Sequence, residues 1–218
     1  RNMTGQFSPS GAPLLSVRDV SVRFGGIVAL DGVTFDVMAG QVAGLIGPNG
    51  AGKTTLFNCL SRLYTPNGGD ILFEGKSILK RPRHDIPHIG IGRTFQNVAL
   101  FDNMSVLDNI KVGCHSRSTT SFFDNALRLP RVLGEEEKIT RRSLELIDFM
   151  DLQPFTSARA GGLPFPIRKR VELARALASS PKLLLLDEPA AGLNHEEIEV
   201  LKGQIKRVRD TQNVTVLL

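Results

Sequence analysis

The residues with the clearest chemistry lie between Gly47 and Thr55, where the sequence runs Gly-Pro-Asn-Gly-Ala-Gly-Lys-Thr-Thr. This run fits the pattern of Gly, any four residues and Gly-Lys-Ser/Thr, which binds nucleotide phosphates. Glycines allow successive backbone N–H groups to converge on phosphate oxygens, and a following helix adds its dipole. The pattern predicts that Lys53 neutralises the β- and γ-phosphates and that Thr54 ligates Mg²⁺. The nucleotide contacts expected in the loop are Gly47, Asn49, Gly50, Gly52, Lys53, Thr54 and Thr55.

Two acidic residues, Asp187 and Glu188, follow the apolar run from Leu183 to Leu186. Four consecutive leucines indicate a buried strand, so both carboxylates are expected to emerge at its end. We expect Asp187 to hold Mg²⁺ through water and Glu188 to polarise the attacking water. A glycine-rich turn with a surface lysine and an acidic turn after a core strand are the alternatives. Neither alternative explains why both groups occur in one chain.

Alternating strands and helices would position these two groups. Short alternating stretches from Leu14 to Val37 predict antiparallel strands. Further strands are expected at 42–46, 70–73, 182–186 and from 214 onward, and helices at 54–63, 140–150, 166–178 and 196–209. Such alternation predicts an α/β fold with a mostly parallel core sheet and helices on its faces.

The sequence predicts four segments. Residues 1–13 are polar and rich in Gly and Pro, as in a flexible tail. Residues 14–96 would form a nucleotide-binding core with an antiparallel β subdomain, and 97–165 a helical subdomain. Residues 166–218 would return to the core. Because position 1 is Arg and the last five residues look like a buried strand, we expect a piece of a longer protein, truncated at its C-terminus.

Composition favours a globular chain in a reducing compartment. With 41% hydrophobic and 22% charged residues, the 218-residue chain is not of a disordered or collagen-like class. Two cysteines do not suggest a disulfide framework. No secretory signal is visible, and no apolar run approaches the roughly 20 residues of a membrane helix. The net charge of +5 suits an anionic ligand, but the basic clusters lack interleaved aromatics, so no nucleic-acid partner is expected.

The stretches Gly47–Thr55 and Leu183–Pro189 together resemble the ATP-binding subunits of ABC transporters. The run Arg93–Asn97 resembles the Q-loop of that family. The resemblance implies that Gln96 contacts the metal and the attacking water and senses a membrane partner. Phe24 matches the aromatic residue that stacks on adenine. An ordinary core phenylalanine and a plain polar loop residue stay open as alternatives for Phe24 and Gln96.

Three further stretches narrow the resemblance to the ATPases of branched-chain amino acid importers: Gly90–Asn97, Phe101–Ile110 and Pro189–Asn194. Lipopolysaccharide-export ATPases share much of this pattern. The resemblance implies a P-loop NTPase cassette of the ABC type that uses ATP and Mg²⁺. It also implies a second ATPase subunit and transmembrane permease subunits as partners. The expected location is peripheral, at the cytoplasmic face of the cell membrane.

The sequence departs from the family at its signature, Leu-Ser-Gly-Gly-Gln, which falls on Leu163–Ile167. The importer subfamily keeps a glycine where this chain has Pro166, and a proline has no N–H to donate to the γ-phosphate held by the opposite subunit. Proline is, however, favoured in the first turn of a helix. Arg168 and Lys169 are candidates to restore part of the attraction for an anion.

Two other functions remain open at this stage. A non-transport ABC ATPase usually has two cassettes or long coiled insertions, and neither is visible here. A regulatory, binding-only cassette is favoured by Pro166 and by the lack of the family's switch histidine, whereas Glu188 favours catalysis. We expect His195, which follows Asn194, to be a surface residue and not a ligand.

Overall fold

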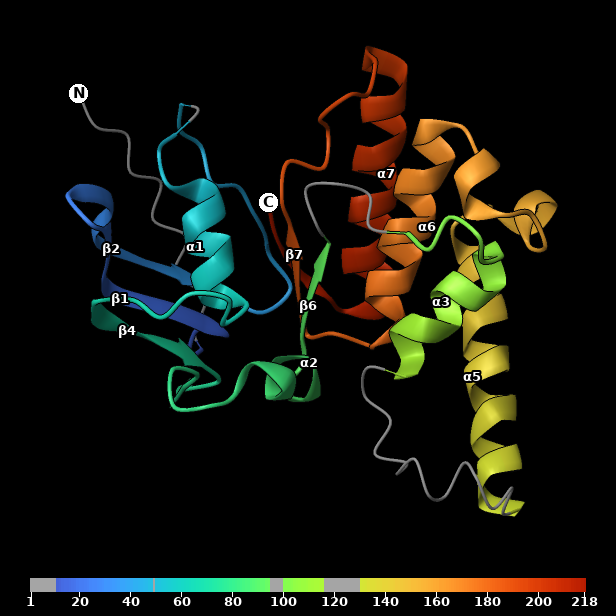
Figure 1. The fold of residues 1–218 in the computed structure, drawn as a ribbon, viewed down its shortest axis with the longest axis horizontal. Coiled ribbons are helices and arrows are strands. Elements are labelled where there is room, and N and C mark those ends of the chain that lie inside the picture. The colour runs from blue at the N-terminus through green and yellow to red at the C-terminus, as the bar shows by residue number, and fades with distance from the viewer. Residues whose placement is uncertain (1–10, 49, 95–99, 116–129) are drawn as a thin grey trace.

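Two four-stranded sheets and a group of helices make up the computed structural model (Figure 1). It describes residues 11–48, 50–94, 100–115 and 130–218, except the side chains of 115 and 130–133. One sheet has the strand order β2-β1-β4-β5 and is antiparallel. The other has the order β3-β8-β7-β6 and is parallel. The expected α/β class, with a parallel core sheet, an antiparallel sheet and helices, is confirmed.

The element bounds are as follows. The strands are β1 Leu15–Phe24, β2 Ile27–Val37, β3 Val42–Ala43, β4 Gly68–Phe73, β5 Lys76–Ser77, β6 Ile91–Thr94, β7 Leu183–Leu186 and β8 Thr215–Leu217. The α-helices are α1 Lys53–Leu60, α2 Ile86–Ile89, α3 Val106–His115, α5 Pro130–Phe149, α6 Phe165–Ala178 and α7 His195–Gln212. Short 3₁₀ turns lie at Arg83–Asp85, Gln153–Phe155 and Ala160–Gly162.

The antiparallel sheet keeps its apolar face buried across a bulge. On β1, Leu15 and Val17 are buried before the bulge, and Val20 and Val22 after it. Strict alternation would fail between Val17 and Val20, but the pairing register shifts there and Asp19 adopts a φ of +50°. The extra residue restores the inward direction of the later side chains. The antiparallel pairing expected for residues 14–37 is confirmed.

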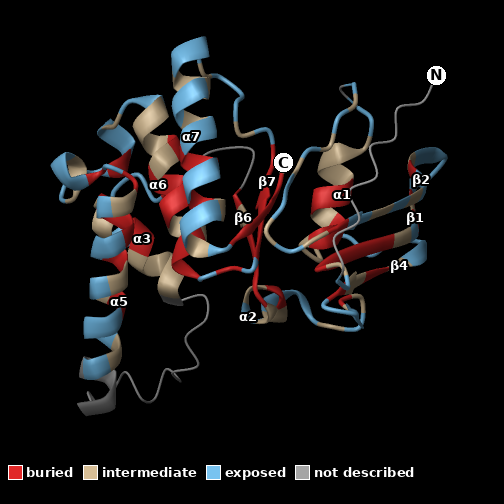
Figure 2. Cartoon of the chain, turned by 180° about the vertical axis from the view of Figure 1, so that it is seen from behind, coloured by how far each residue is buried: buried red, intermediate tan, exposed pale blue. Residues whose placement is uncertain are grey.

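The parallel sheet separates two hydrophobic cores. Along β7, Leu183 and Leu185 pack with α1 and the antiparallel sheet, whereas Leu184 and Leu186 pack with α3, α5, α6 and α7. Successive strand residues point to opposite faces, so a strand covered on both sides must be apolar throughout. Figure 2 shows β6 and β7 as a buried band between the two groups of elements. The neighbouring strand is paired in register, from Ile91 opposite Leu183 to Thr94 opposite Leu186.

Several element ends differ from those expected. The strand predicted at 42–46 pairs only at Val42 and Ala43, because its partner β8 is short; one hydrogen bond from Leu45 to Leu218 (2.6 Å) follows. The helix predicted at 54–63 ends at Leu60, since Arg62 adopts a left-handed φ of +57°. The helix predicted at 196–209 lies within the longer α7, and that predicted at 140–150 forms the last part of α5, which ends one residue earlier, at Phe149. In the described part of the chain, no helix is both long and apolar enough to cross a membrane. The segment boundaries near 13, 96 and 165 stay predictions.

Close packing of α3 on α6 gives a stability prediction. A Cβ at Gly113 would lie 2.1 Å from the carbonyl oxygen of Arg175, so Gly113→Ala forces the two helices apart. We expect it to lower the free energy of unfolding by about 1–3 kcal/mol, as overpacking does. Gly134→Ala is the matched control, because nothing lies within 4 Å of a Cβ there. On α5 it should raise helix propensity and stabilise the chain by up to about 1 kcal/mol. Chemical denaturation measures both changes, and equal effects of the two variants would contradict this packing.

Candidate nucleotide-binding site

The predicted phosphate loop lies between β3 and α1, and two glycines in the left-handed region shape it. Gly50 has a φ of +83° and Gly52, the N-cap of α1, a φ of +81°. A Cβ at Gly52 would lie 2.3 Å from the carbonyl oxygen of Ala29 in β2. Glycine is therefore required there for both conformation and space. The same close approach fixes the loop against the antiparallel sheet.

Lys53, the first residue of α1, folds back over the loop. Its Nζ donates to the carbonyl oxygens of Gly47 (2.5 Å) and Pro48 (3.1 Å). An ammonium group is thus held at the start of a helix whose first-turn N–H groups and dipole also attract anions. Thr54 and Thr55 follow in that first turn and are partly exposed. Asn49 lies outside the described residues, so its predicted contact stays a prediction.

The two acidic residues at the end of β7 differ in their exposure to solvent. Asp187 is 2% exposed, whereas Glu188 is exposed. The sequence predicted that both carboxylates emerge at this strand end, but Asp187 remains within the packed interior. Glu188 has a left-handed φ of +47°. For a residue other than Gly this backbone costs about 1–3 kcal/mol, and such strain concentrates at functional sites.

Arg93 of β6 connects Asp187 to α1, and the sequence interpretation gave it no role. Its Nη2 donates to Oδ2 of Asp187 (3.1 Å), and its Nη1 donates to Oδ1 of Asn58 (2.8 Å) and Oγ of Ser61 (3.1 Å). Burial lowers the pKa of the Arg93 guanidinium, and the hydrogen bond and charge of Asp187 oppose that shift. The sequence signal that could have revealed this role is an arginine within a short, buried strand. A cation buried there requires a partner of opposite charge or a hydrogen-bond acceptor. Gln96, further along the chain, lies outside the described residues.

Two exposed aromatic rings contact each other, one at the end of β1 and one beyond the end of α1. Phe24 is 46% exposed at the end of β1, which excludes the alternative of an ordinary core residue. Its ring centroid lies 5.2 Å from that of Tyr64 in an edge-to-face arrangement. Tyr64, beyond the end of α1, is 41% exposed and was not predicted. The exposed face of either ring is flat and apolar, of the kind that stacks on a nucleobase.

The region of the signature begins a helix, as its proline suggested. Pro166 lies in the first turn of α6, which starts at Phe165. The cations that follow are engaged elsewhere: Arg168 binds Asp102 (2.7 Å), and Lys169 is buried with its Nζ 3.8 Å from Glu172. The expectation that these two residues supply attraction for an anion is therefore corrected, since carboxylates already balance their charges.

The turn after the acidic pair ends in a complete helix cap. Asn194 accepts a hydrogen bond from the backbone N–H of Glu197 (3.0 Å), whose side chain accepts one from the N–H of Asn194 (2.9 Å). Such a capping box stabilises the start of α7. The neighbouring His195 is exposed, as expected for a surface residue.

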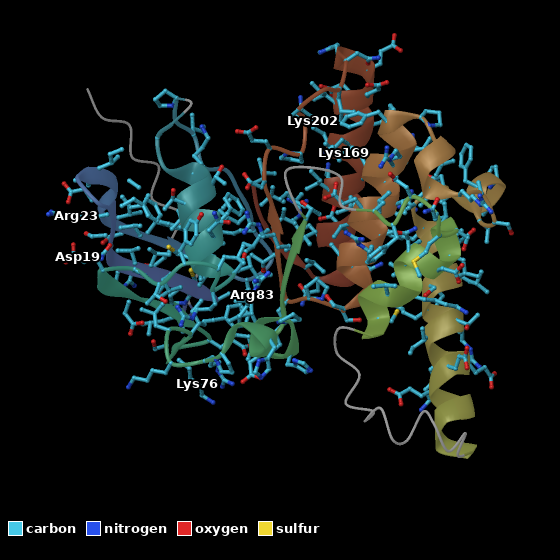
Figure 3. All side chains as sticks on the ribbon, viewed as in Figure 1. Asp19, Arg23, Lys76, Arg83, Lys169 and Lys202 are labelled. Carbon is cyan, nitrogen blue, oxygen red and sulfur yellow. The ribbon has the colours of Figure 1, made fainter. Side chains whose placement is uncertain are left out.

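A cleft of about 580 Å³ lies beside the site, lined by the segment after α1, by α2 and β6, and by α3 and α6. Arg93 lines it together with Arg83, Glu172 and Arg175. Figure 3 shows Arg83 where α2 approaches β6. The remaining lining is largely apolar: Leu63, Ile86, Pro87, Ile91, Gly92, Phe101, Val112, Gly113 and Ala176, with Ser61 and Ser179.

The two cysteines do not offer a reactive thiolate. Cys59 is buried in α1, and burial raises the pKa of its thiol to about 11. Burial also raises the pKa of the Cys114 thiol. Because the thiolate is the reactive form, neither residue is suited to nucleophilic catalysis at neutral pH.

Known proteins resemble this chain over most of its length. The sequence profile of the ABC transporter family matches residues 30–191. The high-affinity branched-chain amino acid transport ATP-binding protein BraF of Pseudomonas aeruginosa is 41% identical over 206 residues, which cover 94% of this chain and 81% of BraF. The corresponding protein LivG of Escherichia coli is 38% identical over the same shares of the two chains.

Solved structures agree with the sequence relatives. A nucleotide-free ATP-binding cassette of an ABC transporter superimposes with a TM-score of 0.81 at 29% identity, covering 94% of this chain and 80% of the cassette. The ADP conformation of an ATP-binding cassette of an ABC transporter gives a TM-score of 0.81 at 30% identity, with 95% and 80% covered. The chain therefore belongs to the ABC transporter family, as an ATP-binding cassette.

Proposed function

We propose that the chain binds Mg·ATP and hydrolyses it to energise an importer of branched-chain amino acids. The observation that carries the proposal is the ammonium group of Lys53, held over a glycine loop at the start of a helix. The names of BraF and LivG support the class of cargo. The three importer-like stretches in the sequence point to the same cargo.

The phosphates of ATP would bind in the loop from Gly47 to Thr55. The backbone N–H groups and the dipole of α1 would face the phosphate oxygens, and Lys53 would exchange its two carbonyl contacts for the β- and γ-phosphates. Adenine would stack on Phe24, with Tyr64 as a second ring. Asn49 is proposed as a further loop contact on sequence grounds.

Three residues would hold the metal: Thr54, Gln96 and Asp187. Mg²⁺ commonly takes one or two carboxylates together with substrate phosphates, so a hydroxyl at the loop and one buried carboxylate fit it. When bound, Mg²⁺ would neutralise the charge that develops on the phosphates. Gln96 is proposed here from the sequence resemblance alone.

Glu188 would orient the attacking water. Its carboxylate can accept a hydrogen bond from the water and take up its proton, while Gln96 would contact the same water. The exposure of Glu188, directly after the buried Asp187, supports this role. Asp187, buried and paired with Arg93, is suited to a fixed carboxylate instead.

We infer that a second ATPase subunit and permease subunits complete the assembly, at the cytoplasmic face of the cell membrane. The cleft beside β6 is our candidate surface for the permease. Its lining includes three arginines (Arg83, Arg93 and Arg175) and one carboxylate (Glu172) on walls that are otherwise largely apolar. That chemistry fits the end of a helix that presents apolar side chains and a carboxylate.

A regulatory cassette that binds ATP without hydrolysing it is the second candidate. Pro166 favours it, because the first turn of α6 lacks one N–H that could reach the opposite nucleotide. The pairing of Arg168 and Lys169 with carboxylates favours it too. Measured hydrolysis by the wild-type protein separates the two functions.

Lys53→Ala should weaken ATP binding. Loss of charge-assisted hydrogen bonds is worth about 1.5–3 kcal/mol, or roughly 10- to 100-fold in affinity. Titration calorimetry with ATP and Mg²⁺ measures it, and Lys76→Ala, at an exposed lysine of β5, serves as the control. Equal affinities of Lys53→Ala and the wild type would exclude the phosphate-loop assignment.

Glu188→Gln should abolish most hydrolysis and leave ATP affinity unchanged. Positioned general bases contribute about 10²- to 10⁴-fold to a rate, and an amide cannot accept the proton. Phosphate release under saturating Mg·ATP is the measurement, with the exposed Glu196→Gln as control. If Glu188→Gln releases phosphate at the wild-type rate, another group is the base.

A photo-crosslinking side chain in place of Val112, in the cleft wall, should capture a permease subunit in intact cells. The same group in place of Lys202, exposed on α7, should not (Figure 3). Mass spectrometry of the crosslinked membrane protein identifies the partner. Capture of the same protein from both positions, or of no permease from position 112, would contradict the assignment of the cleft.

A further inference from the structure

We propose that Arg93 is a positioning residue that couples the cleft to the metal-binding carboxylate of Asp187. Through this coupling, the Mg²⁺ affinity of the nucleotide site depends on how the guanidinium is held. The inference rests on the proposed function, since it concerns the metal that accompanies ATP. It adds a residue to which neither the loop pattern nor the acidic pair assigns a role.

The guanidinium of Arg93 is fixed on three sides. One nitrogen donates to Asp187, and the other donates to Asn58 and Ser61, at and just beyond the end of α1. The ring of Phe57 lies 5.9 Å from its Cζ. With 9% of the side chain exposed, Arg93 cannot move without breaking contacts to two elements. Both elements belong to the proposed nucleotide site, since α1 begins at Lys53 and Asp187 directly follows β7.

The contact with Asp187 determines which carboxylate oxygen is available. Arg93 binds Oδ2, and no described residue forms a hydrogen bond with Oδ1. A carboxylate tied through one oxygen presents the other in a defined direction, toward a metal or its water. Partners that orient a metal ligand in this way commonly contribute 10- to 100-fold to metal affinity. Arg93 is suited to this function because its planar fork can hold several acceptors at once.

The same side chain is part of the cleft wall. Arg93 lines the cavity, and Glu172 and Arg175 of α6 line the opposite side. On β6, Arg93 is paired with Leu185, two residues before Asp187. A carboxylate in the cleft that draws the guanidinium away from Asp187 would therefore change the metal site. Because coupling between two sites is reciprocal, loading the metal site would change the cleft in turn.

A purely structural ion pair is the competing explanation. Breaking a buried pair destabilises a protein strongly in either case, so thermal stability does not separate the two. The distinguishing quantity is the enhancement of ATP binding by Mg²⁺, the dissociation constant in EDTA divided by that in Mg²⁺. If the pair is purely structural, its loss lowers the stability of the variant but leaves this ratio unchanged in the variant protein that is folded.

The first experiment measures that ratio by calorimetry for the wild type, Arg93→Met and Arg93→Lys. We expect Arg93→Met to lower the ratio by about tenfold and Arg93→Lys, which keeps the charge but not the fork, to lower it by about threefold. Arg81→Met, at a partly exposed arginine paired with Asp85, is the matched control and should leave the ratio unchanged. The ATP affinity in EDTA should be the same in all four proteins.

An unchanged or larger ratio in folded Arg93→Met overturns the proposal. If Arg93→Met does not fold, an unchanged ratio in Arg93→Lys overturns it instead. Failure of the proposed function has a different signature, because the wild type itself would then bind no ATP or bind it equally with and without Mg²⁺. A normal wild-type ratio with unaffected variants refutes only the role of Arg93.

A second experiment tests the cleft side of the coupling. Val112→Cys places a thiol in the cleft wall, and mass spectrometry follows its alkylation apart from that of the two native cysteines. We expect Mg·ATP to change this alkylation rate in the otherwise wild-type protein and to have little effect in Arg93→Lys. The same response to Mg·ATP in both backgrounds overturns the coupling to the cleft.

Discussion

The burial of β7 on both faces is the constraint on which the rest of the structure depends. Leu183 and Leu185 face one hydrophobic core and Leu184 and Leu186 face the other, so the strand is a wall shared by two cores. A shift of β7 by one residue would exchange the side chains that face the two cores. Because every residue in the strand is leucine, such a shift would leave both cores apolar. The register is instead set by the polar groups at its end, since only one register brings Asp187 to Arg93.

The nucleotide site contains residues whose backbone conformations are unfavourable for an isolated chain segment. Gly52 is in the left-handed region with β2 against its Cα, and Glu188 adopts a positive φ without being glycine. The ammonium group of Lys53 donates to two carbonyl oxygens, with which a bound anion would compete. The packed strands on either side hold these arrangements, as expected where local strain serves binding or chemistry.

The sequence allowed prediction of those parts of the site that depend on local patterns. The phosphate loop, the leucine strand and the helix starting near Pro166 could be predicted because their determinants lie within a few residues of each other. The pairing of Arg93 with Asp187, 94 residues apart, depends on which strands are neighbours and in what register. The contact of Phe24 with Tyr64 and the pairing of Arg168 with Asp102 depend likewise on tertiary packing. The bulge at Asp19 was missed because alternation alone does not show where an extra residue is inserted.

The apolar cores and the hydrogen bonds of Arg93 between them contribute to the structure in different ways. Each core is apolar and continuous, and the parallel strands β7 and β8 contribute side chains to both. Hydrocarbon contacts are not directional, whereas the hydrogen bonds of Arg93 are, and they lie at the end of the shared wall. Replacing this buried pair with apolar side chains could stabilise the fold as well or better. An apolar replacement would not supply a directional connection between the helix that starts at Lys53, the carboxylate that follows β7 and the cleft.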